Sequence, residues 1–243
     1  MPDDARSRLL NTIRSNIASA GYHITLVQGG RSPRFAYSVG LTDVGDPEVV
    51  LAGAASLGAK AVKRVLDQAV ERSNIGTLSP GEIVDVPDIG SFQVARADPS
   101  WTQRMLLGAF DYYDRRDVTA LQLIPDPSLR TIDVPDMSQQ WDASREPVWR
   151  WLGEDWDLSI PPDAIAVTNL DALRGNPVCE AARWEEAEWE LFAGSGPDTP
   201  RSEVRVVPLS TLLGFDPSLQ AVADLDVGSA IHRDPPGPWE PWG

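Results

Sequence analysis

Hydrophobic residues near the start of the chain follow helical spacing first and strand spacing afterwards. An apolar stripe predicts an amphipathic helix over residues 4–20. Period-two alternation over residues 22–28 and 35–41, with glycines and a proline between them, predicts a β-hairpin. One face of the second strand carries only small residues, Ala36, Ser38 and Gly40. We expect a helix to pack on that face, because small side chains let another backbone approach closely.

The rest of the first 137 residues predicts further strands and helices. The predicted strands span residues 48–52, 82–86, 91–97 and 119–124, and the predicted helices span residues 56–73 and 98–110. Most of these strands have hairpin-like spacing, which leaves few parallel crossovers. We therefore expect an α+β fold with a mixed, mostly antiparallel sheet and flanking helices.

The pattern changes after residue 137. Four tryptophans stand among charged residues over residues 138–160, which we interpret as a tryptophan-rich linker with a short helix over 145–152. Period-two segments then return. They predict strands over residues 164–168, 178–183, 189–192 and 203–207, followed by a helix over 216–224. The tail over 235–243 is rich in proline and tryptophan, so we expect it to lack regular structure.

These patterns divide the chain into an α+β domain over residues 1–137, a linker over 138–160 and a smaller acidic α+β domain over 161–243. Charge follows the same division. Residues 1–137 carry 14 Lys/Arg against 17 Asp/Glu, a net charge of −3, whereas residues 138–243 carry 7 against 19, a net charge of −12. The total of −15 argues against nucleic-acid binding, because phosphate contacts require clustered cations.

Composition also bears on the compartment. The single cysteine, Cys179, cannot form an internal disulfide, which suits a reducing environment. The first residues include two acids and no apolar signal region, and the chain has no run of ~20 apolar residues that could cross a bilayer. We therefore expect a cytoplasmic protein that does not contact membranes.

Few residues offer catalytic or metal chemistry. Two histidines far apart and one cysteine provide no zinc-ligand spacing, and the segment 53–60 lacks the register of a phosphate-binding loop. We therefore expect no metal and no cofactor. Enzymatic activity is still an alternative, because titratable and hydroxyl groups lie near the predicted hairpin. The candidate catalytic residues are His23, Tyr37, Ser38 and Glu48.

An acidic segment of the second half places carboxylates between two indoles. It contains Trp184, Glu185, Glu186, Glu188 and Trp189. A solvated turn that leads into a strand would account for this composition. A protein-binding patch accounts for it as well, because indoles supply contact energy and carboxylates select a basic partner.

Four segments of the first half resemble the DUF4262 family, a bacterial group without an assigned function. They are Gly21-Tyr22-His23, FAYSVGL at 35–41, Asp46-Pro47-Glu48-Val49 and Leu121-Gln122-Leu123. Asp46 stands where that family commonly has histidine, so histidine chemistry at this position is not expected here. In the second half, residues 178–183 and 189–194 resemble DUF2185 domains, which are immunity-protein-like domains found with bacterial toxin systems.

The resemblances imply a bacterial protein with an immunity or regulatory role. Together with the acidic second half, they favour a protein-binding module whose partner is basic, such as a toxin, rather than an enzyme. The alternative is a small-molecule-binding protein or enzyme with its site around His23 in the first domain. Oligomeric state is not defined by the sequence.

Overall fold

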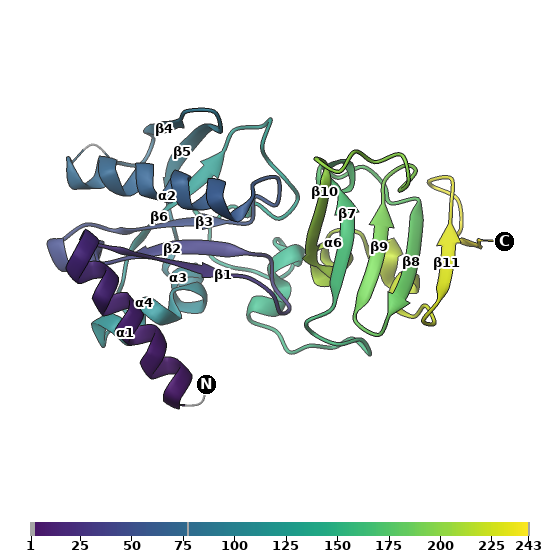
Figure 1. Ribbon diagram of the computed structural model, residues 1–243, viewed down its shortest axis with the longest axis horizontal. Helices are drawn as coiled ribbons and strands as arrows, with labels where there is room; N and C mark the ends of the chain where they lie inside the picture. The colour runs from purple at the N-terminus through teal and green to yellow at the C-terminus, as the bar shows by residue number, and fades with distance from the viewer. Residues whose placement is uncertain (1–2, 77, 243) are drawn as a thin grey trace.

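A computed structural model, which describes residues 3–76 and 78–242, contains two six-stranded sheets with flanking helices (Figure 1). Sheet A comprises β1 (His23–Val27), β2 (Phe35–Val39), β3 (Glu48–Ala52), β4 (Ile83–Val86), β5 (Gly90–Arg96) and β6 (Ala120–Pro125) in the order β1-β2-β3-β6-β5-β4. Sheet B comprises β7 (Ile165–Asn169), β8 (Glu180–Glu185), β9 (Glu188–Phe192), β10 (Val204–Pro208), β11 (Ser229–His232) and β12 (Glu240–Pro241) in the order β10-β7-β9-β8-β11-β12. Neighbouring strands are antiparallel except β3 with β6 and β7 with β9. The predicted α+β class is confirmed.

The helices lie outside the two sheets. The α-helices are α1 (Asp3–Ala20), α2 (Ala59–Asn74), α3 (Pro99–Met105), α4 (Leu107–Tyr113), α5 (Leu170–Leu173), α6 (Leu209–Phe215) and α7 (Gln220–Ala223). Three short 3₁₀ helices are η1 (Leu41–Val44), η2 (Pro147–Leu152) and η3 (Pro217–Leu219).

Both faces of sheet A are covered. On one face, Ala36 of β2 lies in a core cluster with Val62 and Leu66 of α2, so the predicted helix does pack on the small-residue face. On the other face, Tyr37 lies in a second cluster with residues of α1, α3 and α4, including Ile13 and Trp101. The strands of this sheet are therefore buried from two sides, which requires apolar or hydrogen-bonded side chains on both faces.

Sheet B is covered on one face. Trp189 and Leu191 of β9 pack with Leu212 of α6 and Val222 of α7 in a third core cluster. Side chains alternate between the faces of a strand, so Glu190, between Trp189 and Leu191, points to the opposite face. No helix lies on the near side of sheet B in Figure 1. We call this side the open face.

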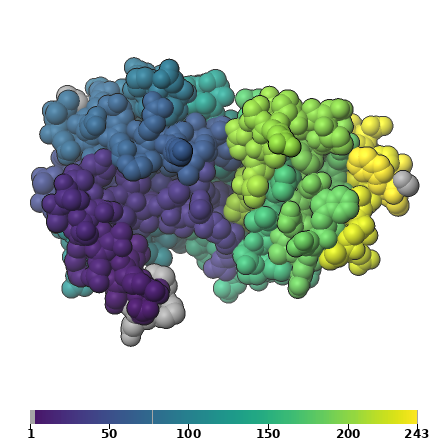
Figure 2. Space-filling model, in the orientation of Figure 1, coloured from purple at the N-terminus to yellow at the C-terminus, as the bar shows by residue number. Residues whose placement is uncertain are grey.

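The segment 138–160 connects the two cores. Trp149 of η2 packs into the cluster of sheet A, and Trp151, two residues later, packs into the cluster of sheet B. The halves also meet through Arg205 of β10, whose guanidinium donates to the carbonyls of Ala55 at 3.1 Å and Ser56 at 3.0 Å. The space-filling view shows the two halves abutting (Figure 2).

Some expected elements differ from those observed. The predicted helix over 98–110 is two helices that meet at Leu106, and this break brings the Gly108 N–H to the Tyr37 hydroxyl at 3.1 Å. A Cβ at position 108 would lie 2.7 Å from that hydroxyl, so the approach requires glycine. Five of the described elements were not predicted, namely η1, α5, α6, β11 and β12. The tail over 235–243 is not wholly irregular, because β12 pairs with β11.

Candidate functional site

Glu48 lies at the centre of a buried hydrogen-bond network. Its carboxylate is 0% exposed and accepts hydrogen bonds from the Ser38 hydroxyl at 2.6 Å, the Thr42 N–H at 3.0 Å and the Gly40 N–H at 3.2 Å. The Tyr113 hydroxyl of α4 also donates to it. These donors come from β2, from the turn that follows β2 and from α4, so one carboxylate joins three parts of the domain.

The same network perturbs two titrating groups. Burial raises the pKa of Glu48 above its ordinary value, although its hydrogen bonds act in the opposite direction. Burial and the neighbouring Glu48 raise the pKa of Tyr113. Because Glu48 and Ser38 are each 0% exposed, a substrate in solution does not reach them. The network stabilises the turn that follows β2.

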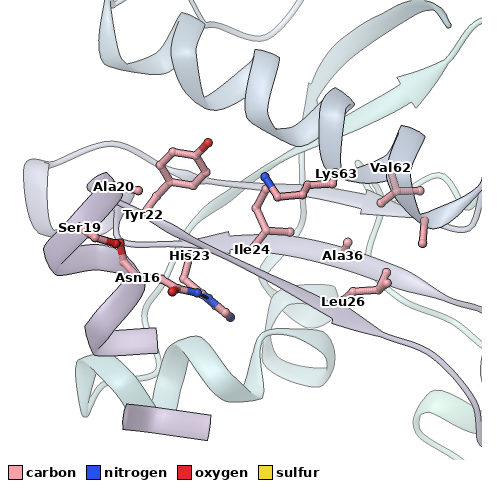
Figure 3. A pocket seen from close by; sticks show the side chains of 11 residues that line it. Asn16, Ser19, Ala20, Tyr22, His23, Ile24, Leu26, Ala36, Val62 and Lys63 are labelled. Carbon is pink, nitrogen blue, oxygen red and sulfur yellow. Dashed lines mark hydrogen bonds between the residues drawn. The ribbon is translucent and has the colours of Figure 1, made fainter. Parts of the chain in front are cut away.

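His23 lies elsewhere, in a surface hollow of about 420 Å³ between α1, β1 and α2 (Figure 3). Its Nδ1 accepts from the Asn16 side-chain amide at 2.7 Å, and burial lowers the pKa of the ring. The hydroxyl of Tyr22, on the α2 side, donates to Asp67 at 2.8 Å, and Lys63 pairs with the same carboxylate at 2.7 Å. We call this feature the β1 hollow.

The candidate catalytic residues therefore do not form one cluster. Only His23 lines the β1 hollow, whereas Ser38 and Glu48 are enclosed in the interior. Tyr37 is also buried, and burial raises the pKa of its hydroxyl. The acids near Glu48 have separate partners, since Asp46 accepts from Ser73. Within residues 3–76 and 78–242, no group of three His, Cys, Asp or Glu residues could hold a metal ion.

The acidic segment of the second half forms the end of β8, a turn and the start of β9. Trp184 is 51% exposed, and Glu185 at the end of β8 and Glu186 in the turn are exposed as well. Trp189, by contrast, is 0% exposed, and its indole N–H donates to the Val222 carbonyl at 3.1 Å, so its side chain lies in the core and not at the surface. The reason is the strand period, which places Trp184 and Trp189 on opposite faces of sheet B.

Trp184 instead belongs to a hollow of about 520 Å³ on the open face of sheet B. We call it the tryptophan hollow. Its lining includes Trp184, Trp242, Glu180, Glu190, Ala182 and Phe192. The two indoles are 51% and 50% exposed, and the Trp242 ring lies 5.5 Å from the ring of His232. The Gly196 N–H orients the Glu180 carboxylate at 2.8 Å.

The sequence analysis missed five of these residues, Glu180, Ala182, Glu190, Phe192 and Trp242. Period-two alternation could have found the first four, because it places Glu180, Ala182 and Trp184 on one face of β8 and Glu190 and Phe192 on one face of β9. Trp242 carried no such signal, because it reaches the hollow through the pairing of β12 with β11, which places it beside residues distant in sequence.

The comparisons with known proteins concern mainly the first half. A family model described as a domain of unknown function, DUF4262, matches residues 16–128. This range contains all of the residues on which the resemblance rested. No curated protein and no solved structure matches the chain. Among the helices that the structure describes, none has the length and apolar character needed to span a membrane.

Proposed function

We propose that the protein is a protein-binding module whose second half takes a basic segment of a partner, while residues 16–128 match the family model for a domain of unknown function, DUF4262. The observation that carries this proposal is the tryptophan hollow. It combines two half-exposed indoles with the Glu180 and Glu190 carboxylates on a sheet face that none of the described helices covers. Exposed aromatic groups beside a concave apolar surface are typical of binding sites.

The chemistry of the hollow favours a cationic side chain. An arginine guanidinium can stack on an indole face and form charge-assisted hydrogen bonds with a carboxylate at the same time. Neither Glu180 nor Glu190 has a cationic partner within the described residues, so both carboxylates can accept one from outside. Phe192 and Ala182 provide apolar contact for the aliphatic stem of such a side chain.

Charge around the hollow supports the same partner. Residues 138–243 carry a net charge of −12, and Glu185, Glu186 and Glu188 lie near the hollow on the β8–β9 hairpin. A field of this sign accelerates the encounter with a cationic protein and repels an acidic one. The proposed partner is therefore a basic protein, and the resemblance to immunity-protein-like domains favours a bacterial toxin in the cytoplasm.

A peptide titration tests the proposal. We would titrate an arginine-rich synthetic peptide into the full-length protein and measure the dissociation constant by calorimetry. Glu190→Lys and Trp184→Ala should each weaken binding about tenfold or more, because each removes a central contact. The matched control is Glu71→Lys, which makes the same charge change at an exposed position of α2.

The outcomes separate the site from general charge attraction. If Glu71→Lys weakens binding as much as Glu190→Lys, the peptide responds only to net charge and the hollow is not the site. The proposal also fails if the peptide does not bind the wild-type protein. The expected result is a loss confined to the two hollow variants, with unchanged melting temperatures.

A further inference from the structure

Strand β1 forms an exposed edge of sheet A. It pairs with β2 and with no other strand that the structure describes. The edge of a sheet presents backbone N–H and C=O groups that can pair with an additional strand. The β1 hollow lies along this edge, with α1 on one side and α2 on the other (Figure 3).

The direction of the β1 backbone follows from the register of the hairpin. The Gly53 N–H donates to the Arg34 carbonyl at 2.8 Å, so the backbone of Arg34 points toward β3. Backbone direction alternates along a strand, so Phe35 and every second residue after it point toward β1. Their partners in β1, which are Val27, Thr25 and His23, direct their N–H and C=O groups toward β2. The intervening residues, Ile24 and Leu26, therefore direct their N–H and C=O groups toward the hollow.

The other sheet edges have features that prevent pairing. In β4, Asp85 places a charge in the strand and Arg72 of α2 donates to the Ile83 carbonyl. In β10, Arg205 binds the other half of the molecule, and β12 contains Pro241. By contrast, β1 has the sequence HITLV, with no proline and no Lys, Arg, Asp or Glu. Natural edge strands that lack such protection are sites for strand addition or aggregation.

The walls of the hollow differ in polarity. On the α2 side, Val62 and Ala36 join Ile24 and Leu26 in an apolar surface. On the α1 side lie the polar groups of Ser19, Asn16 and His23. Since Asn16 donates to Nδ1 of His23 and burial lowers the pKa of the ring, the neutral imidazole keeps its proton on Nε2 as a donor.

We propose that an extended segment of a partner protein adds to β1 as a seventh strand of sheet A. Its side chains would alternate between apolar residues facing α2 and hydrogen-bond acceptors facing α1, because side chains in a strand alternate between faces. Its backbone would pair with the N–H and C=O groups of Ile24 and Leu26.

Lys63 adds one requirement to the segment that fits. Lys63 is the charged side chain that lines the hollow, and it contacts Asp67 through both carboxylate oxygens. An ammonium group has three donors, so one remains for the partner. The incoming strand therefore places a hydrogen-bond acceptor beside Lys63, whose charge Asp67 already balances. This requirement differs from the cationic side chain proposed for the tryptophan hollow, and the two sites are independent.

The probe for this site is a displayed library of random heptapeptides, selected on the full-length protein. We expect the selected sequences to alternate apolar residues with residues that carry a hydrogen-bond acceptor. Synthetic versions with single N-methyl groups should lose binding at every second position only, because N-methylation removes one donor and alternate donors face β1.

Two variants of the protein test the location. Leu26→Pro removes an N–H that faces the hollow and has no strand partner, so it should abolish binding with little change in melting temperature. Ala59→Tyr fills the hollow from an exposed position of α2 and should weaken binding at least about tenfold. The matched control, Ala18→Tyr, lies at an exposed position of α1 outside the lining and should leave binding unchanged.

Several results would overturn the proposal. Binding that survives both variants, or N-methyl scans without alternation, would exclude strand addition at β1. A wild-type dimer that Leu26→Pro converts to a monomer would show that a second copy of this chain occupies the edge. Glu190→Lys should have no effect on these peptides, so failure here is distinguishable from failure of the proposed basic partner.

Discussion

Sheets A and B have the same number of strands and one parallel pair each, but they differ in what covers their faces. Helices bury both faces of sheet A, and the polar groups within it, such as Glu48 and Ser38, have partners inside the domain. Sheet B has its core on one face only and presents carboxylates and indoles on the other.

The difference indicates where each half can interact with other molecules. The faces of sheet A are occupied, so binding to its strands is confined to an edge. The open face of sheet B is available along β8, β9 and β11. Residue type alone does not decide whether a side chain is available for binding, since Trp149 and Trp184 are chemically identical but are 1% and 51% exposed.

Removing one tryptophan from each environment should give the largest contrast in stability. We expect Trp149→Ala to reduce the free energy of unfolding by about 3–5 kcal/mol, because it leaves a cavity among Phe35 and Trp101. Trp184→Ala should change it by less than ~0.5 kcal/mol. Urea unfolding followed by circular dichroism measures both. Comparable losses would contradict the assignment of an open face.

Substitution of Glu48 tests whether the buried polar groups of sheet A stabilise the folded protein. Glu48→Ala leaves the Ser38, Thr42 and Tyr113 donors without their acceptor, and we expect a loss of about 2–3 kcal/mol. Glu48→Gln keeps one carbonyl oxygen and should cost less. A Glu48→Ala protein with wild-type stability would show that the network contributes little.

The same carboxyl predicts a pH dependence. Because burial raises the pKa of Glu48, the folded state holds this proton more tightly than the unfolded state. The stabilising contribution is complete below the ordinary glutamate pKa of ~4.3 and is lost as pH rises through the folded value. Melting curves from pH ~4 upward should show this decline in wild type, and Glu48→Gln should lack it.

Substitution of Arg205 tests how much the contact between the two halves contributes to stability. Arg205→Gln removes charge-assisted hydrogen bonds to the carbonyls of Ala55 and Ser56, with an expected cost of about 1–2 kcal/mol. Hydrogen exchange near residues 53–57 should become faster, while exchange within β8 and β9 should not change. If exchange rises throughout sheet B, the junction and the sheet unfold as one unit.

The smallest expected effect belongs to His23. Burial lowers its pKa, so the folded state binds this proton less tightly than the unfolded state. Stability should fall as pH drops below the ordinary histidine pKa of ~6.5 and level off below the folded value. We expect His23→Gln to reduce this acid-side loss by less than ~1 kcal/mol. Parallel pH dependence in the variant and wild type would contradict the burial of this ring.

The sequence pattern predicted the strands of sheet A well. Both the period-two alternation of strands and the helical spacing of apolar residues can be recognised within a short segment of the chain. The pattern identified the small face of β2 and the helix that covers it. It did not predict the break at Leu106, which depends on Tyr37, a residue distant in sequence. In sheet B, α6 was missed because its residues, LSTLLGF, are buried on nearly all sides and so lack an amphipathic pattern.

The sites were predictable to different degrees. Composition located the acidic segment, but the choice between exposed Trp184 and buried Trp189 required the strand register. The hydrogen-bond partners of Glu48 come from segments that the fold alone brings together, so the sequence could present Glu48 as a catalytic candidate without revealing its enclosure.

The most direct test of the binding account is a nuclear magnetic resonance titration that observes the indole N–H groups of the nine tryptophans. An arginine-rich peptide added to the full-length protein should shift the resonances of Trp184 and Trp242 in a saturable way and leave those of Trp149 and Trp189 unchanged. If the resonances of Trp184 and Trp242 do not shift while the peptide binds, the open face of sheet B is not the binding surface.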